Sequence, residues 1–257
     1  MLNITLIQTE LYWQNSTANL AMLEEKIHQI AQPTDLIVLP EMFNSGFTMN
    51  VQAVGEVMNQ HTFKWMKAMA AQTGAVVTGS YIVKEGNKAF NRLVWMQPDG
   101  QFDHYDKRHL FRMGKEHLAF EAGNHKIIKE LKGWKICPLI CYDLRFPVWS
   151  RNTNLEYDLL IYTANWPARR ANHWNVLLQA RAIENQCFVA GLNIVGQDGN
   201  DLTYQGDSAL IDFRGEYLHK ANNDATIFSM NLDKEALAEY RKQFPAYLDA
   251  DEFEIKG

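Results

Sequence analysis

The sequence has little cysteine and no long hydrophobic run. Its 257 residues include three cysteines, Cys137, Cys141 and Cys187, an odd and low number that argues against a disulfide framework and indicates a reducing compartment. Two of them lie in one predicted strand, about 13 Å apart, too far to form a disulfide. No apolar run approaches the roughly 18 residues of a membrane span, and no signal-peptide pattern opens the chain. We therefore expect a cytoplasmic protein without membrane contact.

Patterns for binding metals, phosphates and nucleic acids are also absent. The histidines show none of the spacings typical of a zinc site, and there is no glycine-rich phosphate loop. The Gly-Asp-Ser segment at 206–208 differs from the Gly-x-Ser-x-Gly turn of serine hydrolases. The net charge of −5 is opposite in sign to the basic surface of most nucleic-acid binders. These absences predict a protein without metal, cofactor or nucleic-acid partner.

Apolar, strand-like runs alternate with helical patterns along the whole sequence. Apolar residues at helical spacing predict helices at 19–32, 61–72, 171–186 and 233–243. Strands are predicted at 3–9, 36–39, 134–141, 158–163, 187–193 and 226–231, with three between 75 and 106 and two around the turn at 214–215. Wholly apolar strands indicate a sheet buried on both faces, and the hairpins indicate a mixed sheet. The alternation predicts an α/β layered sandwich.

No repeat, low-complexity tract or linker interrupts the chain, so we expect one domain over residues 1–257. The segment 246–257 is polar and aromatic. It is either a loose end or an arm that docks on a partner subunit.

Three polar segments each lie at or just after the end of a predicted strand, where α/β sheets bind ligands. Glu41 lies in the first segment, Leu-Pro-Glu-Met-Phe at 39–43. Lys107 lies in the second, Tyr-Asp-Lys-Arg-His-Leu at 105–110. Cys141 begins the third, Cys-Tyr-Asp-Leu-Arg-Phe-Pro at 141–147. Taken singly, the cysteine is most often a core residue and the two charges are most often solvated. Together they supply a nucleophile, a base and a cation for an oxyanion, which is what a thiol needs to attack an amide.

The three segments resemble the signature segments of the nitrilase superfamily of carbon–nitrogen hydrolases, and they occur in the order of that family. The resemblance covers nearly the whole chain and includes the segments at 165–167, 173–174, 179–186 and 206–208. It implies a four-layer α-β-β-α sandwich, a homodimer and catalysis without a cofactor.

The resemblance also implies a role for each residue of the site. Glu41 would be the general base, Lys107 the cation beside the oxyanion and Cys141 the nucleophile that forms a thioester. The backbone N–H of Tyr142 would be the second oxyanion donor.

Many members of the superfamily carry a second carboxylate between the lysine and cysteine segments. Glu116 matches it best here, Glu121 is the competitor, and the implied role is to orient Lys107 and the substrate amide. Because a free carboxyl group is a weak base for a free thiol, we expect burial to raise the carboxylate pKa and Lys107 to lower the thiol pKa.

Within the superfamily, the segments at 106–114, 141–152 and 164–167 most closely resemble the bacterial omega-amidase branch, which is related to the animal omega-amidase. This implies hydrolysis of the terminal amide of 2-oxoglutaramate or 2-oxosuccinamate to a 2-oxo acid and ammonia. Val148 stands where many neighbouring branches have a glutamate, which weakens inferences from those branches.

Two alternatives to the omega-amidase stay open. One is an amidohydrolase for an aliphatic amide, an N-carbamoyl compound or a nitrile, and the other is a non-catalytic binding protein on the same fold.

The remote carboxylate of such a substrate needs a cation, and bidentate arginine matches it best. We expect Arg145 to shape this part of the pocket. The arginines considered after it are Arg108, Arg112 and Arg169. The aromatic residues expected to line the pocket are Tyr142, Phe43 and Trp166.

Overall fold

The structure, a computed structural model, describes residues 1–255. The last two residues of the segment 246–257 therefore lie outside the described residues. The strands of the first sheet are β1 (Leu2–Gln8), β2 (Leu36–Val38), β3 (Glu56–Val57), β4 (Val76–Glu85), β5 (Lys88–Met96), β6 (Phe102–Asp106) and β15 (Thr226–Leu232). The strands of the second sheet are β7 (Lys129–Leu131), β8 (Trp134–Ile140), β9 (Leu159–Thr163), β10 (Phe188–Leu192), β13 (Ala209–Ile211) and β14 (Tyr217–Lys220).

A separate hairpin and seven α-helices complete residues 1–255. The hairpin pairs β11 (Val195–Gln197) with β12 (Thr203–Gln205). The helices are α1 (Ser16–His28), α2 (Val51–Val54), α3 (His61–Thr73), α4 (Glu116–Ala119), α5 (Pro147–Ser150), α6 (Ala171–Asn185) and α7 (Lys234–Gln243). Short 3₁₀ turns occur at Arg112–Gly114, Cys141–Arg145, Thr153–Leu155, Ala168–Arg170 and Ala246–Asp249. No helix in residues 1–255 is both long and apolar enough to cross a membrane.

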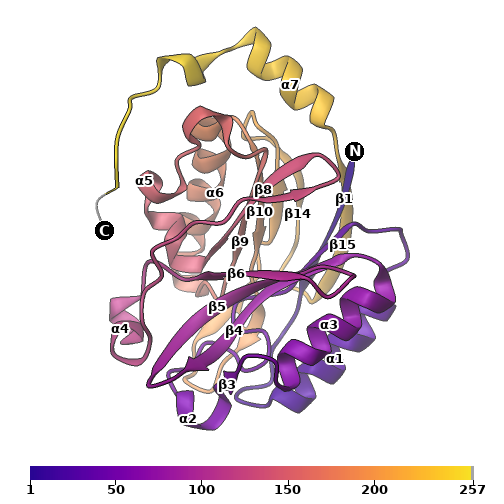
Figure 1. Cartoon of the computed structure of the whole chain (residues 1–257), viewed down its shortest axis with the longest axis vertical. Helices are drawn as coiled ribbons and strands as arrows, with labels where there is room; N and C mark the ends of the chain where they lie inside the picture. Colours follow the sequence, from indigo (N-terminus) through magenta and orange to yellow (C-terminus); the bar gives the residue numbers. More distant parts are fainter. Residues whose placement is uncertain (256–257) are drawn as a thin grey trace.

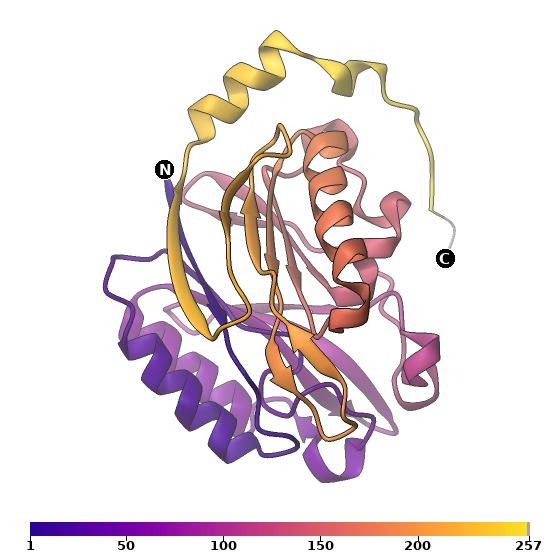
Figure 2. The same cartoon turned by 180° about the vertical axis from the view of Figure 1, so that it is seen from behind.

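The two sheets pack face to face, with helices on their outer faces (Figures 1 and 2). The first sheet has the order β15-β1-β2-β4-β5-β6, with β3 beside β4, and the second has the order β14-β13-β10-β9-β8-β7. Helices α1 and α3 cover the first sheet, and α6 covers the second. The expected four-layer α-β-β-α sandwich is confirmed. Both sheets mix parallel and antiparallel pairs, for example β1 with β2 and β1 with β15.

The alternation of side chains along the strands produces the layers, because successive residues point to opposite faces. In β9, Leu159 and Ile161 join the core between the sheets. Leu160 and Tyr162 point the other way and pack with Trp174 of α6. A wholly apolar strand therefore packs into two cores, one between the sheets and one beneath a helix. The sequence indicated one sheet buried on both faces, whereas the structure divides the strands between two such sheets.

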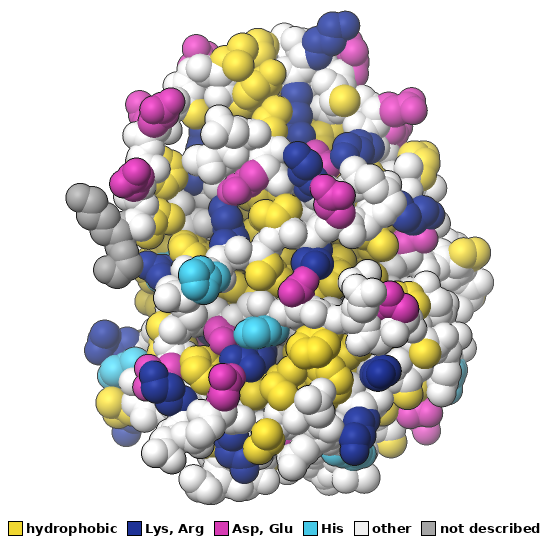
Figure 3. Space-filling view, in the orientation of Figure 1, with side chains coloured by type: hydrophobic (Ala, Val, Ile, Leu, Met, Phe, Trp, Pro, Cys, Tyr) yellow, Lys and Arg dark blue, Asp and Glu magenta, His cyan; other side chains and the backbone are white. Residues whose placement is uncertain are grey.

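The C-terminal segment leaves the sandwich and runs along its outside (Figure 2). Helix α7 is anchored by Leu237, which lies in the core between the sheets, and by Arg241, whose Nη1 lies 2.9 Å from Asp158 Oδ1. Beyond it, Leu248, Phe253 and Ile255 are exposed. On the face drawn in Figure 3, charged side chains of both signs are interspersed with hydrophobic ones.

Candidate active site

The three polar segments meet where strands of both sheets end. Glu41 follows β2, Lys107 follows β6 of the same sheet, and Cys141 follows β8 of the second sheet. Glu41 and Lys107 are fully buried, and the thiol-bearing residue is 8% exposed. The site therefore lies between the two sheets, with a narrow opening at Cys141.

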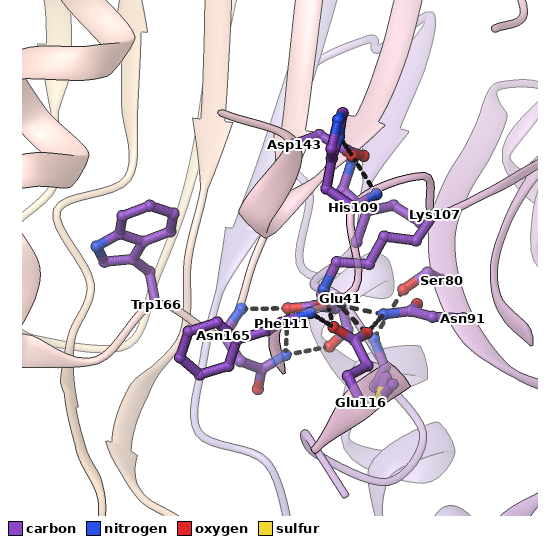
Figure 4. Close-up of polar contacts among 12 residues, drawn as sticks. Glu41, Ser80, Asn91, Lys107, His109, Phe111, Glu116, Asp143, Asn165 and Trp166 are labelled. Carbon is purple, nitrogen blue, oxygen red and sulfur yellow. Dashed lines mark hydrogen bonds and ion pairs between the residues drawn. The ribbon is translucent and has the colours of Figure 1, made fainter. Parts of the chain in front are cut away.

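Lys107 lies between two carboxylates (Figure 4). Its Nζ is 2.8 Å from Glu41 Oε1 and 3.0 Å from both carboxylate oxygens of Glu116. Glu116, the first residue of α4, is also fully buried and accepts a hydrogen bond from the backbone N–H of Phe111. Glu121, by contrast, has a side chain that is 54% exposed and faces Lys88. Glu116, and not Glu121, is therefore the second carboxylate that lies beside Lys107.

Two asparagines fix the Glu41 carboxylate. Asn165, just after β9, donates its backbone N–H to Glu41 Oε2 at 2.8 Å and its side-chain amide to the Glu41 carbonyl oxygen at 2.6 Å. Asn91 of β5 donates its side-chain amide to Glu41 Oε1 at 2.9 Å and to Glu116 Oε1 at 3.2 Å. Both carboxylates are therefore held by neutral donors as well as by Lys107.

Cys141 occupies a strained backbone conformation. Its φ is +42°, in the left-handed region that L-residues with a Cβ rarely adopt. Asp143 stabilises this turn, because its Oδ2 accepts hydrogen bonds from the Ile140 backbone N–H at 3.1 Å and from the Tyr105 hydroxyl at 2.8 Å. Its Oδ1 accepts the backbone N–H of His109 at 3.0 Å. The first N–H groups of such a helical turn have no partner within the turn, which leaves that of Tyr142 available beside the thiol.

Burial and charge shift the pKa values of the cluster. Burial raises the pKa of the Cys141 thiol well above its usual value, and Glu41 raises it further, while Lys107 lowers it by less. Lys107 lowers the thiol pKa as expected, but that pKa is raised on balance, because desolvation of the thiolate outweighs one nearby cation. Burial alone would lower the pKa of Lys107, but Glu116 and Glu41 raise it above its usual value. Burial raises the pKa of Glu116, against the opposing effect of Lys107.

A pocket opens over Cys141 and Lys107. As expected, Tyr142 and Trp166 line it. Phe43 is a correction: its ring is fully buried against Trp65 and Tyr81 in the core beneath α3, so it does not reach the pocket. Other aromatic rings, which the sequence did not single out, line the pocket instead: Phe47, Phe111 and Tyr204.

The candidate arginines separate into two groups. Arg145 and Arg169 line the pocket, together with Arg170, which the sequence analysis missed. Arg108 instead lies over the Trp149 ring, 4.6 Å from its centroid, in a different surface depression. Arg112 is exposed and does not line the pocket.

Two further residues of the site also escaped the sequence analysis. Asn165 lies two residues after the strand predicted at 158–163, so the strand-end rule that selected Glu41 and Cys141 could have found it. Asn91 lies inside β5, where a polar residue gives no such signal. Within residues 1–255, no group of three or more His, Cys, Asp or Glu side chains is arranged to hold a metal ion.

Solved structures define the class to which this sandwich belongs. XC1258 from Xanthomonas campestris, a CN-hydrolase superfamily protein with an arsenic adduct in its active site, is 44% identical, with a TM-score of 0.97 and 99% of each chain covered. Nit3 from Saccharomyces cerevisiae, in branch 10 of the nitrilase superfamily, is 24% identical, with a TM-score of 0.83 over 95% of this chain and 94% of that chain. The second likeness concerns the fold alone. The fold is that of the nitrilase superfamily, as the resemblance implied.

The chain belongs to the carbon-nitrogen hydrolase family, whose profile matches residues 3–242. It is a hydrolase that acts on carbon–nitrogen bonds other than peptide bonds. Omega-amidase YafV from Escherichia coli (strain K12) is 49% identical over 255 residues, which are 99% of this chain and 98% of the relative. The 2-oxoglutaramate amidase of Bacillus subtilis (strain 168) is 34% identical over 250 residues and 96% of both chains.

Proposed function

We propose that this protein is an omega-amidase that hydrolyses the terminal amide of 2-oxoglutaramate or 2-oxosuccinamate. The observation that carries the proposal is the pocket that Cys141 and Lys107 line together with three arginines. The two amidases described above, which resemble the chain over nearly its whole length, support the choice of substrate.

The first half of the proposed reaction forms a thioester. Cys141 Sγ attacks the amide carbon while Glu41 accepts the thiol proton. Because the pKa of the thiol is raised, the resting enzyme holds a neutral thiol, and proton transfer accompanies attack. Lys107 Nζ and the Tyr142 N–H stabilise the oxyanion. Glu41 then gives the proton to the amide nitrogen, the carbon–nitrogen bond breaks, and ammonia leaves.

The second half hydrolyses the thioester. Glu41 removes a proton from a water molecule, whose oxygen attacks the thioester carbon, and the same two donors stabilise the second oxyanion. The carbon–sulfur bond breaks and the proton returns from Glu41 to the thiolate of Cys141. The products are the 2-oxo acid and the original enzyme, and no cofactor is consumed.

Glu116 acts through Lys107 in this scheme and is a positioning residue. Its two oxygens lie equally close to Nζ, so together with Glu41 they fix the position of the ammonium. Its negative charge also keeps the buried Lys107 protonated, which the oxyanion requires.

Ammonia release tests the proposal, with 2-oxoglutaramate, 2-oxosuccinamate, an aliphatic amide, an N-carbamoyl compound and a nitrile as substrates. We expect the two 2-oxo acid monoamides to have the highest kcat/KM, and mass spectrometry to detect an acyl adduct on Cys141. Faster turnover of a simple amide or a nitrile would reassign the protein within the family. Absence of both turnover and adduct would leave a non-catalytic binding protein.

We also propose a homodimeric protein that works in the cytoplasm as one domain, with residues 246–257 as an arm docked on the partner subunit. Several exposed apolar side chains lie on this one segment, Leu248 and Phe253 among them, and they support the arm, because grouped exposed apolar side chains mark interaction sites whereas single ones do not. The three buried free thiols suit a reducing compartment. Sedimentation of the full chain and of a chain ending at residue 245 tests the arm: we expect a dimer and a shift toward monomer, respectively.

A further inference from the structure

Three arginines line the pocket that opens over Cys141. They are Arg145, Arg169 and Arg170, and no carboxylate side chain of residues 1–255 lines this pocket with them. Within that described part of the chain, none of the three forms an ion pair. Like charges repel one another, so a fold gathers them without counter-charges only where something else compensates.

Contacts with aromatic side chains hold two of these arginines in place. The Arg145 guanidinium lies over the Trp166 ring, 5.0 Å from its centroid, and its Nη2 is 2.7 Å from His173 Nδ1. The Arg170 guanidinium lies 5.2 Å from the centroid of Phe111. Stacking uses the face of a guanidinium and leaves the N–H groups at its edge available for an oxygen ligand. Both groups are therefore oriented without being neutralised.

Arg170 is fixed at both its backbone and its side chain. Its backbone carbonyl accepts the Trp166 indole N–H at 2.8 Å, and its N–H donates to the Pro167 carbonyl at 2.9 Å. Burial lowers the pKa of Arg170, and the charges of Arg169 and Arg145 lower it further. A bound anion would relieve this repulsion. Arg169 itself is exposed at the rim of the pocket, where it attracts anions without being enclosed.

We propose that Arg145 and Arg170 form a carboxylate-binding subsite beside Cys141, which selects small amides that carry a carboxylate at their other end. The inference rests on the proposed function for the amide and on the arginine pair for the carboxylate. It replaces Arg108 and Arg112, which point elsewhere, with Arg170.

Paired substrates test the subsite. Kinetics are measured with 2-oxoglutaramate and with pentanamide, an amide of the same chain length without a carboxylate. For Arg145→Gln and Arg170→Gln, we expect kcat/KM for 2-oxoglutaramate to fall about 10- to 100-fold, mainly through KM, and kcat/KM for pentanamide to stay nearly unchanged. The exposed Arg112→Gln is the matched control and should behave as the wild type with both substrates. An equal loss with both substrates, or no loss with either, overturns the proposal.

A conservative variant separates charge from geometry. Arg170→Lys keeps the positive charge but loses the planar, bidentate edge, so we expect a 2-oxoglutaramate kcat/KM between those of the wild type and Arg170→Gln. Circular dichroism of each variant checks folding. If Arg170→Lys restores nothing although it is folded, the arginine does not act as a cation for the substrate and the proposal fails.

Binding without turnover distinguishes this proposal from the proposed function. In Cys141→Ala, which lacks the nucleophilic thiol, we expect calorimetry to detect binding of 2-oxoglutarate, weakened about 10- to 100-fold by adding Arg170→Gln. If the wild type hydrolyses no amide but this binding is found, the function fails and the subsite stands. If amides are hydrolysed without preference for a carboxylate and 2-oxoglutarate does not bind, the subsite fails and the amidase stands.

Discussion

Lys107 Nζ lies 2.8 Å from Glu41 Oε1, and neither side chain is exposed to solvent. Charges taken out of water at this depth require partners on every side, and Glu116 supplies the second partner at 3.0 Å. The cluster has two carboxylates for one ammonium, so it holds an excess negative charge beside the thiol. Burial first, and the neighbouring Glu41 next, raise the pKa of the Cys141 thiol and keep it protonated.

Cys141→Ala is expected to abolish amide turnover while leaving the fold intact, because the side chain removed is small and lies at the mouth of the site. Ammonia release and circular dichroism measure the two effects. Cys137→Ala is the matched control, since Cys137 lies four residues earlier in β8 and is buried in the core. It should lose about 1 kcal/mol of stability and keep its turnover. Substantial activity in Cys141→Ala would rule out the thioester route.

Glu116→Gln is expected to lower kcat about 10- to 100-fold, because Lys107 loses a charged partner but keeps an acceptor. The pKa of Lys107 should fall as one of the two carboxylates that raise it is removed, so the alkaline limb of the pH–rate profile should move to lower pH. Glu121→Gln is the control, because that half-exposed side chain faces only Lys88. If both variants lose activity equally, the assignment of the second carboxylate is wrong.

Asn91→Asp is expected to lower kcat by about 100-fold and to change KM little. The substitution removes the amide that donates to both Glu41 and Glu116 and adds a third carboxylate, which destabilises the charged forms of the other two. Kinetics over a range of pH should show the acid limb displaced to higher pH. The control is Asn15→Asp at the exposed N-cap of α1, where aspartate caps as well as asparagine. An unchanged pH profile in Asn91→Asp would contradict a positioning role.

The raised pKa of Cys141 predicts how stability depends on pH. The unfolded thiol loses its proton around its ordinary pKa of 9.0, whereas the folded thiol keeps it to higher pH. The folded state then binds more protons, so this contribution to stability is fully present below pH 9 and is lost as pH rises through the folded pKa. One proton corresponds to about 1 kcal/mol per pH unit.

Cys141→Ala removes the contribution of the Cys141 thiol to the pH dependence of stability. Its free energy of unfolding should therefore fall less steeply than that of the wild type between pH 9 and pH 10, as measured by urea titration at each pH. Asn15→Asp should keep the wild-type slope. If Cys141→Ala has the same slope as the wild type, the folded thiol titrates near its ordinary value, and the account of its burial is incorrect.

Element prediction succeeded where apolar periodicity was strong and failed where short polar segments form structure only through their neighbours. The strand predicted at 134–141 and the helix predicted at 171–186 correspond to β8 and α6. The hairpin β11–β12 was missed, because residues 195–205 are rich in turn-forming Gly, Asn and Asp. Tyr204, which this hairpin brings to the pocket, was missed with it.

The sequence by itself determined the layered α/β class and the three polar segments at strand ends, because burial of alternating side chains and the ends of strands are local properties. Only the tertiary structure decided which residues meet. It joined Asn91 to Glu41 and Glu116 across three segments, turned Phe43 into the core and brought Arg170 beside Arg145. These outcomes depend on how two sheets pack against each other, and that packing fixes distances between residues far apart in the chain.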